Sequence, residues 1–417
     1  MSELTLERAA RTTPVTSLSD TEAAGIDLDK MRKYRLGRLR EQLVKQNVGA
    51  CVLLNPYSIR YATGFRNCAI FQTHIQAGYL FVPAEGPVIL FDGDLGAVNG
   101  PGLGTIDEVR EDVLPLSYFF GGTRLDDWYA RWAAQITELV DRHCGDNRRL
   151  GVERAGTRAP GAFAGHNIEV VDAVDVIEAA RVIKSPEEIL CMNAAIAAAE
   201  DGMWRMHEAL QPGITEVELW SHLWSANIRW GGDWCECRLL SSGDRTNPWL
   251  QEASHRMIRA GDLVAFDTDM IGPFGYCADV SRTYFCGPGR PRAYQKDLYQ
   301  RAYDEVQQNL ELMRPGASFR DITNKSFKQP EEFRAQHYPV VAHGVGMSDE
   351  WPTIFYPDDV EHLGYDGVLE TGMTICVESY VGEVGGPEGV KLEQQIVITD
   401  NGHEVLSRFP FEEDLLA

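Results

Sequence analysis

The sequence predicts an α+β protein of two domains, and three features lead to that expectation. The 417 residues exceed what a single hydrophobic core usually serves. The first part of the chain alternates short apolar runs with helical stretches, which is typical of an α/β domain. The later part opens with two helices and then turns mainly to strands. We expect an N-terminal arm over residues 1–20, a smaller α/β domain over 21–184 and the second domain over 185–417.

The expected N-terminal domain begins with a helix and continues as short strands. Leu28–Asn47 has helical periodicity with a basic outer face. The run VGACVLLN then reads as a strand, and GYLFVPAEGPVILF as two strands joined by a Gly/Pro turn. A helix near Asp126–His143 precedes another strand, RLGVER. The sequence of this region contains no glycine-rich phosphate loop, so a nucleotide site is not expected.

The C-terminal domain begins at a strong helix-start signal. Ser185 is placed as N-cap, Pro186 at the first helical position and Glu188 where it completes a capping box. A long helix follows, and a second one covers Glu216–Arg229. The strands expected after it are CECRLLSSG, LVAFDTDMIG, DVSRTYFCG, MTICVESYVGEV and VKLEQQIVIT. A helix over about 294–313 interrupts them.

Composition and charge restrict the partners that the protein is expected to have. The formal net charge of −23 argues against nucleic acid or an anionic membrane, because both attract basic surfaces. A small zwitterionic substrate remains compatible, since it responds to the local field of a pocket. The sequence has no apolar run of membrane-spanning length and no secretory signal pattern at its start. The nine cysteines lack paired spacing, which indicates reduced thiols in a cytoplasmic protein.

Six ionisable residues stand in sequence contexts that are typical of a buried core. They are Asp267, Asp269, Asp279, His343, Glu378 and Glu393. In VAFDTD, a period of two places the first two aspartates on the same strand face. Asp279 opens the next strand after a Gly- and Pro-rich turn, so a hairpin would return it beside them. The histidine lies in VVAHGVG, whose glycines let a backbone bend closely around a site.

Two accounts of these residues are possible. Any one of them alone is best understood as satisfied by backbone amides or an arginine, as most single buried acids are. Five carboxylates and a histidine together would raise one another's pKa values and cost stability. Divalent cations remove that repulsion, and an oxygen-rich set with one imidazole suits Mn, Fe, Co or a catalytic Zn pair. We therefore expect two metal ions per chain that share bridging carboxylates.

The order Asp–Asp–His–Glu–Glu, with GY-x-x-D-x-S-R-T and the HGVG turn, resembles the pita-bread metalloenzymes such as methionine aminopeptidase, prolidase and creatinase. The resemblance implies a pita-bread fold from Ser185 onward, after a creatinase-like α/β domain. Two departures stand out. In the peptidases, one metal aspartate precedes the second at a spacing that lies between the two found here. In this chain Asp267 and Asp269 precede Asp279 by twelve and ten residues. Where the peptidases carry a second histidine, as in HGIGLDVHE, this chain reads HGVGMSDEW, which argues against amide hydrolysis.

Both departures resemble the corresponding segments of the DddP-type dimethylsulfoniopropionate lyases. The same is true of RLLSSGDRTNPW, VESYVGEVGG, VKLEQQ and YSIRYATGF. This resemblance implies a carbon–sulfur lyase that forms dimethyl sulfide and acrylate by β-elimination. It makes all six residues above metal ligands, Asp349 the catalytic base and Tyr338 a substrate-pocket residue. It further implies iron, with Mn, Co, Zn, Ni and Cu as alternatives, and a cytoplasmic homodimer.

The residue types agree with that chemistry. A metal centre would neutralise the substrate carboxylate, and a carboxylate that is not a ligand would remove the neighbouring proton. Asp349 follows a glycine turn six residues after His343, although capping of the next turn would also account for it. Trp351 is a candidate substrate contact that could also raise the pKa of Asp349 by desolvation. Aromatic faces would hold the cationic sulfonium, and the chain offers Tyr338, Trp351, Trp234 and Trp249 for this.

Other interpretations stay open at this point. One is a carbon–nitrogen hydrolase on the same scaffold, either an X-Pro dipeptidase or a small-molecule amide or ring hydrolase such as an ectoine hydrolase. Another is a non-catalytic binding module, which the full set of ligand types disfavours. Arg282 and Lys391 are expected to be charge partners of the acids. Arg245 is either a structural salt-bridge donor or a ligand for a substrate carboxylate.

Overall fold

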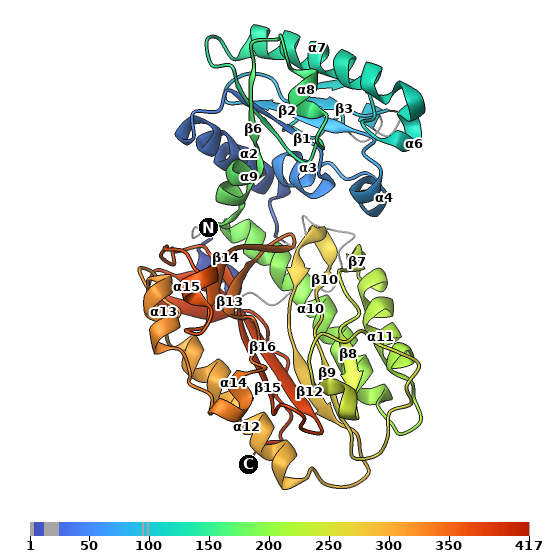
Figure 1. Cartoon of the computed structure of the whole chain (residues 1–417), viewed down its shortest axis with the longest axis vertical. Coiled ribbons are helices and arrows are strands. Elements are labelled where there is room, and N and C mark those ends of the chain that lie inside the picture. Colours follow the sequence, from blue (N-terminus) through green and yellow to red (C-terminus); the bar gives the residue numbers. More distant parts are fainter. Residues whose placement is uncertain (1–3, 12–24, 94–95, 98–99, 417) are drawn as a thin grey trace. The chain divides into compact units, whose positions relative to one another are not determined.

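The structure is a computed structural model that describes residues 4–11, 25–93, 96–97 and 100–416. The chain divides into two compact units (Figure 1). One is Asp27–Arg181, and the other is Val182–Ala417 together with the described residues up to Ile26. Among the described helices, none combines the length and apolarity that a membrane span requires.

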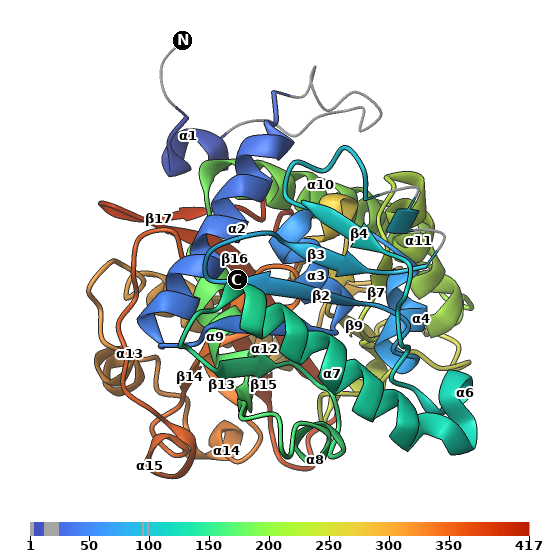
Figure 2. The same cartoon turned by 90° about the horizontal axis from the view of Figure 1, so that it is seen from above.

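The unit over Asp27–Arg181 is a six-stranded sheet of order β4-β3-β2-β1-β5-β6. Its strands are β1 (Ala50–Leu53), β2 (Tyr79–Pro83), β3 (Ile89–Phe91), β4 (Glu108–Arg110), β5 (Arg149–Val152) and β6 (Glu169–Asp172). Its helices are α2 (Leu28–Lys45), α3 (Pro56–Thr63), α4 (Ala69–His74), α6 (Tyr118–Gly121), η1 (Gly122–Arg124), α7 (Leu125–His143), α8 (Ala159–Ala162) and α9 (Val174–Arg181). Strand β1 pairs antiparallel with β2 and parallel with β5. Figure 2 shows β4, β3 and β2 side by side.

The core of this unit lies between the sheet and α7. Trp132 and Ile136 of α7 are fully buried against sheet residues such as Phe81 and Leu150. Helices α2 and α9 pack together, and Figure 1 shows them on the opposite side of the sheet from α7. The α/β expectation for this part of the chain is therefore confirmed, because strands that bury both faces need helices on each.

In the part of the chain that the structure describes, the second unit combines three sheets with long helices. Its helices are α1 (Leu6–Ala10), α10 (Pro186–Ala209), α11 (Glu216–Arg229), η2 (Gly243–Thr246), η3 (Pro273–Gly275), α12 (Ala293–Leu310), α13 (Phe319–Lys325), α14 (Glu331–Arg334) and α15 (Val360–Leu363). One sheet has the order β11-β10-β7, formed by β7 (Trp234–Cys235), β10 (Met270–Ile271) and β11 (Cys277–Ala278). The next has the order β12-β9-β8, formed by β8 (Leu240–Ser242), β9 (Leu263–Phe266) and β12 (Arg282–Phe285). The largest has the order β14-β13-β15-β16-β17, formed by β13 (Val340–Val345), β14 (Asp349–Phe355), β15 (Thr374–Gly382), β16 (Gly389–Thr399) and β17 (Gly402–Val405).

Strand alternation in the largest sheet separates an apolar face from a polar one. Helix α12 packs on β15 and β16. The residues that share its core are Ile375, Val377 and Val381 of β15 and Val390, Leu392, Ile396 and Ile398 of β16. Since neighbouring residues of a strand point to opposite faces, Glu378 and Glu393 lie on the face away from this core. The period of two thus buries two acids without placing them in the apolar layer.

The helix-start signal at the head of the second unit is confirmed. Ser185 Oγ accepts a hydrogen bond from the Glu188 amide at 3.3 Å, and Glu188 Oε2 accepts one from the Ser185 amide at 2.8 Å. Glu188 Oε1 also accepts the Tyr276 hydroxyl at 2.9 Å, which ties the first turn of α10 to the segment before β11. The cap therefore contributes to tertiary packing as well as to helix formation.

Two local expectations differ from the structure. Within the expected arm over residues 1–20, Leu6–Ala10 form α1, and Asn193 of α10 donates to the Ala9 oxygen at 2.8 Å. Residues 12–20 of that arm lie outside the described residues. The single strand expected over LVAFDTDMIG is wrong, because β9 ends at Phe266 and Asp269 has a φ of +36°. That left-handed conformation breaks the pleat, and β10 starts only after it.

Arg282 of β12 joins the end of the chain to the middle of the sheet. Its guanidinium donates to the backbone oxygens of Ser281 (2.8 Å), Glu393 (2.6 Å), Phe409 (2.6 Å) and Pro410 (3.3 Å) and to Gln394 Oε1 (2.7 Å). Its carbon Cζ also lies 4.2 Å from the centre of the Phe411 ring. Arg282 was expected to be a charge partner of the acids, but these acceptors are uncharged. It fastens strands together instead.

The capping geometry gives a stability prediction. We expect Ser185→Ala to lower the stability of the second unit by about 1 kcal/mol, and its melting temperature by about 2–4 °C, because the Glu188 amide loses its partner in a buried place. Thr215→Ala removes the equivalent capping box of α11, where Thr215 is only half-buried. Calorimetric melting of the metal-free variants checks this. A larger effect at Thr215 than at Ser185 would contradict the tertiary role of the α10 cap.

Candidate metal centre

The structure brings the acids predicted from sequence into one buried cluster. Asp267 follows β9, Asp269 precedes β10, Asp279 lies between β11 and β12, His343 is in β13, Glu378 in β15 and Glu393 in β16. Oxygens of Asp267, Asp269 and Asp279 all lie within 4.8 Å of one another. Ligand atoms of Asp279, His343 and Glu393 form a second such group, so Asp279 belongs to both.

Thr268 holds the two aspartate segments side by side. Its Oγ1 donates to the Ala278 oxygen at 2.8 Å and accepts from the Val280 amide at 3.0 Å, on either side of Asp279. The threonine between the two acids of FDTD is therefore what fixes their distance to the third. The expectation that Asp267 and Asp269 share one face of a strand is wrong, because β9 ends at Phe266. The two side chains converge because the backbone turns at Asp269.

Strand pairing positions the other ligands. Glu378 of β15 lies directly opposite Glu393 of β16, and His343 of β13 lies opposite Cys376 of β15. His343 Nε2 is 3.0 Å from Glu378 Oε1 and 3.5 Å from Asp279 Oδ2. The antiparallel register thus brings ligand atoms from three separate sequence motifs next to one another.

Cys376 belongs to the cluster, and sequence reasoning missed it. Its Sγ groups with the ligand atoms of Asp279, His343 and Glu393 and contacts the Asp279 backbone oxygen at 3.8 Å. Burial, together with the charge of Asp279, raises the pKa of this thiol well above its ordinary value. The signal was available in TICVES, because Cys376 and Glu378 are two residues apart and share a strand face.

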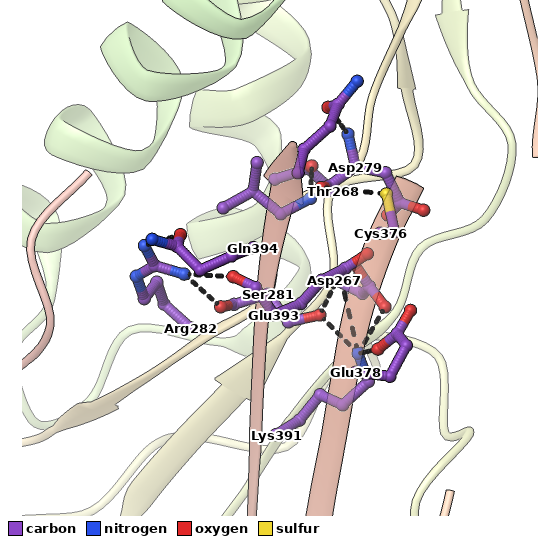
Figure 3. Close-up of polar contacts among 12 residues, drawn as sticks. Asp267, Thr268, Asp279, Ser281, Arg282, Cys376, Glu378, Lys391, Glu393 and Gln394 are labelled. Carbon is purple, nitrogen blue, oxygen red and sulfur yellow. Dashed lines mark hydrogen bonds and ion pairs between the residues drawn. The ribbon is translucent and has the colours of Figure 1, made fainter. Parts of the chain in front are cut away.

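Lys391 places a cation within the acid cluster. Its Nζ contacts Glu378 Oε2, lies 3.3 Å from Asp267 Oδ2 and 3.6 Å from Glu393 Oε2, and donates to Ser281 Oγ at 2.7 Å (Figure 3). The side chain is completely buried. The expectation that Lys391 pairs with the acids agrees with this geometry, and its position two residues before Glu393 accounts for the shared face.

Burial and mutual repulsion set the charge state of the acids. Desolvation, followed by the charges of neighbouring acids, raises the pKa values of Asp269, Asp279 and Glu393 well above their ordinary range. Burial alone would do the same to Asp267, but Lys391 and hydrogen bonds lower its pKa. Burial would lower the pKa of His343, yet the contact with Glu378 and the charge of Asp349 raise it to about 10. The cluster therefore retains protons at neutral pH.

The donor set fits metal ions, as three oxygen atoms indicate. Asp267 Oδ1, Asp279 Oδ1 and Glu393 Oε1 are buried and have no hydrogen-bond partner among the described residues. A buried carboxylate oxygen without a partner is costly, so each calls for a ligand. Lys391 lies near the other oxygens of Asp267 and Glu393, namely Oδ2 and Oε2. Protein partners and a metal would thus use different oxygens of the same carboxylates.

Asp349 lies beside this cluster but differs from its members. It is the first residue of β14, its side chain is 66% exposed, and its Oδ1 lies 3.9 Å from His343 Nδ1. The surrounding protein raises the pKa of Asp349 by desolvation, against the opposing charge of His343. An acid in this position can reach a molecule bound at the metal-ligand atoms without being one of them.

Aromatic side chains border the cluster. Lys391 Nζ lies 4.5 Å from the ring centre of Tyr338 and 5.9 Å from that of Trp249. Trp249 also stacks on Tyr380, with centroids 6.1 Å apart. Trp351 packs on Phe319 and Tyr365 instead, with centroids 5.6 Å and 6.3 Å away. The structure therefore brings Tyr338 to the cluster, whereas the predicted substrate role of Trp351 stays a prediction.

The choice that the sequence left open for Arg245 is decided by its neighbours. Its Nη1 pairs with Glu216 Oε2, and its Nη2 donates to the Glu252 oxygen at 2.9 Å. Glu216 is fully buried and also accepts from both the amide and the hydroxyl of Ser242. Arg245 thus acts as a salt-bridge donor in the fold.

Comparison with known proteins gives the same two-part division. The family model for the Creatinase/Prolidase N-terminal domain matches residues 35–183, and the model for metallopeptidase family M24 matches residues 190–400. The Xaa-Pro dipeptidase from Bacillus anthracis has a similar fold, with a TM-score of 0.73 at 21% identity, over 91% of this chain and 99% of the dipeptidase. All the ligand residues predicted from sequence fall inside the M24 match.

Two curated relatives are similar over almost the whole chain. The protein named dimethylsulfoniopropionate lyase DddP from Roseovarius nubinhibens is 37% identical over 398 residues, which cover 94% of this chain and 88% of the relative. The protein of the same name from Roseobacter denitrificans is 34% identical over the same shares. The buried acid cluster, the M24 match and these two relatives together establish that the chain belongs to metallopeptidase family M24 and carries a creatinase/prolidase N-terminal domain.

Proposed function

We propose that this protein is a metal-dependent lyase that cleaves dimethylsulfoniopropionate into dimethyl sulfide and acrylate. One observation carries the proposal: a carboxyl group, that of Asp349, stands beside the ligand cluster with most of its surface exposed. A peptidase of this family needs a group there that stabilises an oxyanion, whereas an elimination needs a base. The names of the two curated relatives support the same reaction.

The elimination is balanced by residues of this chain. Asp349 takes the proton from the carbon next to the substrate carboxylate. The electron pair of that C–H bond forms the new carbon–carbon double bond, and the adjacent carbon–sulfur bond breaks. Dimethyl sulfide leaves with the pair of the broken bond and is neutral, and acrylate keeps the carboxylate. The protonated Asp349 then returns its proton to water, so no oxidant or reductant is consumed.

The six clustered residues would hold the metal ions, and Lys391 would help to set the charge of the site. Bound metal would supply Lewis-acid stabilisation of negative charge on the substrate carboxylate. Five carboxylates carry five negative charges, two divalent ions would carry four positive charges, and Lys391 adds one more. The sum is zero, so Lys391 supports a neutral site that can accept an anionic carboxylate.

The proposal includes a place for the sulfonium group of the substrate. Tyr338 borders the cluster and presents an aromatic face, which suits a sulfonium. Trp351 is proposed as a second substrate contact.

By resemblance to the lyases, we also propose iron as the metal, a homodimer as the assembly and the cytoplasm as the location. Neither nucleic acid nor a membrane is proposed as a partner.

The role of Asp349 gives the first functional prediction. We expect Asp349→Asn to reduce the release of dimethyl sulfide by about 10²- to 10⁴-fold, because an amide cannot accept the proton. Metal content per chain should stay that of the unchanged protein, since Asp349 is not one of the clustered ligands. Headspace gas chromatography of metal-loaded enzyme measures the product, and elemental analysis measures the metal.

Asp358→Asn is the matched control, because Asp358 is a surface acid that pairs with Arg334. It should leave the rate unchanged. If the unchanged protein releases no dimethyl sulfide with any of Fe, Mn, Co, Zn, Ni or Cu, the lyase proposal is wrong. Hydrolysis of an X-Pro dipeptide or of a cyclic compatible solute by the same preparations would then favour the carbon–nitrogen hydrolase.

The charge state of the cluster predicts how metal binding depends on pH. Metal ligands must lose their protons, and the pKa values of Asp269, Asp279, Glu393 and His343 are raised, so the metal-free site keeps protons to a higher pH than ordinary side chains of these types do. Because these sites lose protons as pH rises, we expect metal affinity to increase with pH between about 6 and 9. Calorimetry in two buffers of different ionisation enthalpy should show net proton release. An affinity independent of pH, with no proton release, would contradict this.

A further inference from the structure

The residue that follows Asp349 belongs to a buried ion pair. Lys184 Nζ is 2.7 Å from Glu350 Oε2, and each of the two side chains is only 2% exposed. Glu350 Oε1 accepts the Met347 amide at 2.9 Å, so the carboxylate closes the turn that leads into β14. Lys184 is fastened at its own backbone, since its amide donates to the Gly372 oxygen at 2.9 Å.

The glycines of the HGVG segment make room for this carboxylate. A Cβ atom added to Gly346 would lie 2.3 Å from Glu350 Oε1. One added to Gly344 would lie 2.4 Å from the Trp351 backbone oxygen. Both distances are far below van der Waals contact, so any larger residue would push Glu350 or the start of β14 outward.

The same turn is joined to the segments that carry metal ligands. The Cys277 amide donates to the Gly346 oxygen at 2.7 Å, two residues before Asp279. Thr374 at the start of β15 donates through Oγ1 to the Val345 oxygen. The turn between β13 and β14 is thus held against β11 and β15 on the side of the ligand cluster.

Strand alternation connects the ion pair to Asp349. Neighbouring residues of a strand point in opposite directions, so an inward Glu350 requires an outward Asp349. The burial of the two residues agrees, with Glu350 at 7% and the Asp349 side chain at 66% exposed. Holding Glu350 in place therefore sets where the Asp349 carboxylate lies relative to His343.

A stability role accounts for this pair poorly. Burying two charges costs desolvation that their attraction barely recovers, and well-packed apolar residues often stabilise a protein as much or more. An ion pair does, however, fix direction and distance more strictly than apolar contacts do. We propose that Lys184 and Glu350 are positioning residues that orient Asp349 for proton abstraction. This inference rests on the proposed function of Asp349 as base.

The first test removes the cation. We expect Lys184→Met to lower kcat by about 10- to 100-fold with little change in KM, because a misplaced base slows proton transfer more than it weakens substrate binding. Metal content should not change. Lys184→Arg keeps the charge and should recover most of the rate. The matched control is Arg256→Met, which removes the cation of a 2.6 Å pair with Asp262 away from the cluster and should leave kcat unchanged.

The second test asks whether Lys184 acts through Asp349. If it does, Lys184→Met added to Asp349→Asn should slow the residual reaction no further, because the group being positioned is already inactive. Fully multiplicative losses in the double variant would overturn the proposal. So would a Lys184→Met enzyme that loses bound metal and recovers its rate when metal is restored.

A third measurement does not depend on the substrate. Hydrogen exchange of the Met347 amide reports directly on the hydrogen bond to Glu350. We expect Lys184→Met to speed this exchange and Arg256→Met to leave it unchanged. If the unchanged protein releases no dimethyl sulfide, the proposed function fails, and the exchange result alone then decides whether the pair holds the turn. Unchanged exchange in Lys184→Met would overturn the positioning proposal in either case.

Discussion

Mutual repulsion among five buried carboxylates is the constraint on which the rest of the second unit depends. The carboxylates come from four separate segments, with Asp267 and Asp269 in one of them, and the fold must bring the segments together against that repulsion. Thr268 fixes the first two acids to the third, and strand register sets Glu378 opposite Glu393. Lys391 neutralises part of the charge from within. Three carboxylate oxygens have no partner among the described residues, so protein groups do not compensate the whole buried negative charge. The site therefore calls for metal ions.

The proposed lyase reaction relies on a group at the edge of the metal-ligand set, which is compatible with a scaffold that peptidases also use. The fold is similar to that of an Xaa-Pro dipeptidase, but a fold does not by itself set the reaction, and in the proposed lyase the turn after HGVG carries the group that would. In this chain that turn presents an exposed carboxylate outward and buries a second one inward. Two adjacent acids, Asp349 and Glu350, thus differ in exposure because they point to opposite faces of one strand.

Much of the site could be predicted from sequence, since each ligand sits in an apolar run where a charged side chain is costly to bury unless it binds something. The helix cap at Ser185 was equally predictable, because capping is decided within four residues. The expectations failed where distant groups decide the outcome. The left-handed turn at Asp269 depends on Thr268 and its contacts across the neighbouring segment. Alternation in TICVES places Cys376 on the face of Glu378, but only the pairing with β13 brings it opposite His343. Several acceptors of Arg282, such as Phe409, come from segments far along the chain.

The Arg282 contacts have a consequence for the order in which the protein is made. The ligands extend from Asp267 to Glu393, and Arg282 fastens their strands to Phe409 and Pro410, a few residues before the last residue given in the sequence. Until these residues have been synthesised, the chain lacks both the last ligand strand and the contacts that secure it. Metal would be captured only after that, so the ions then present in the cell would select what the site contains.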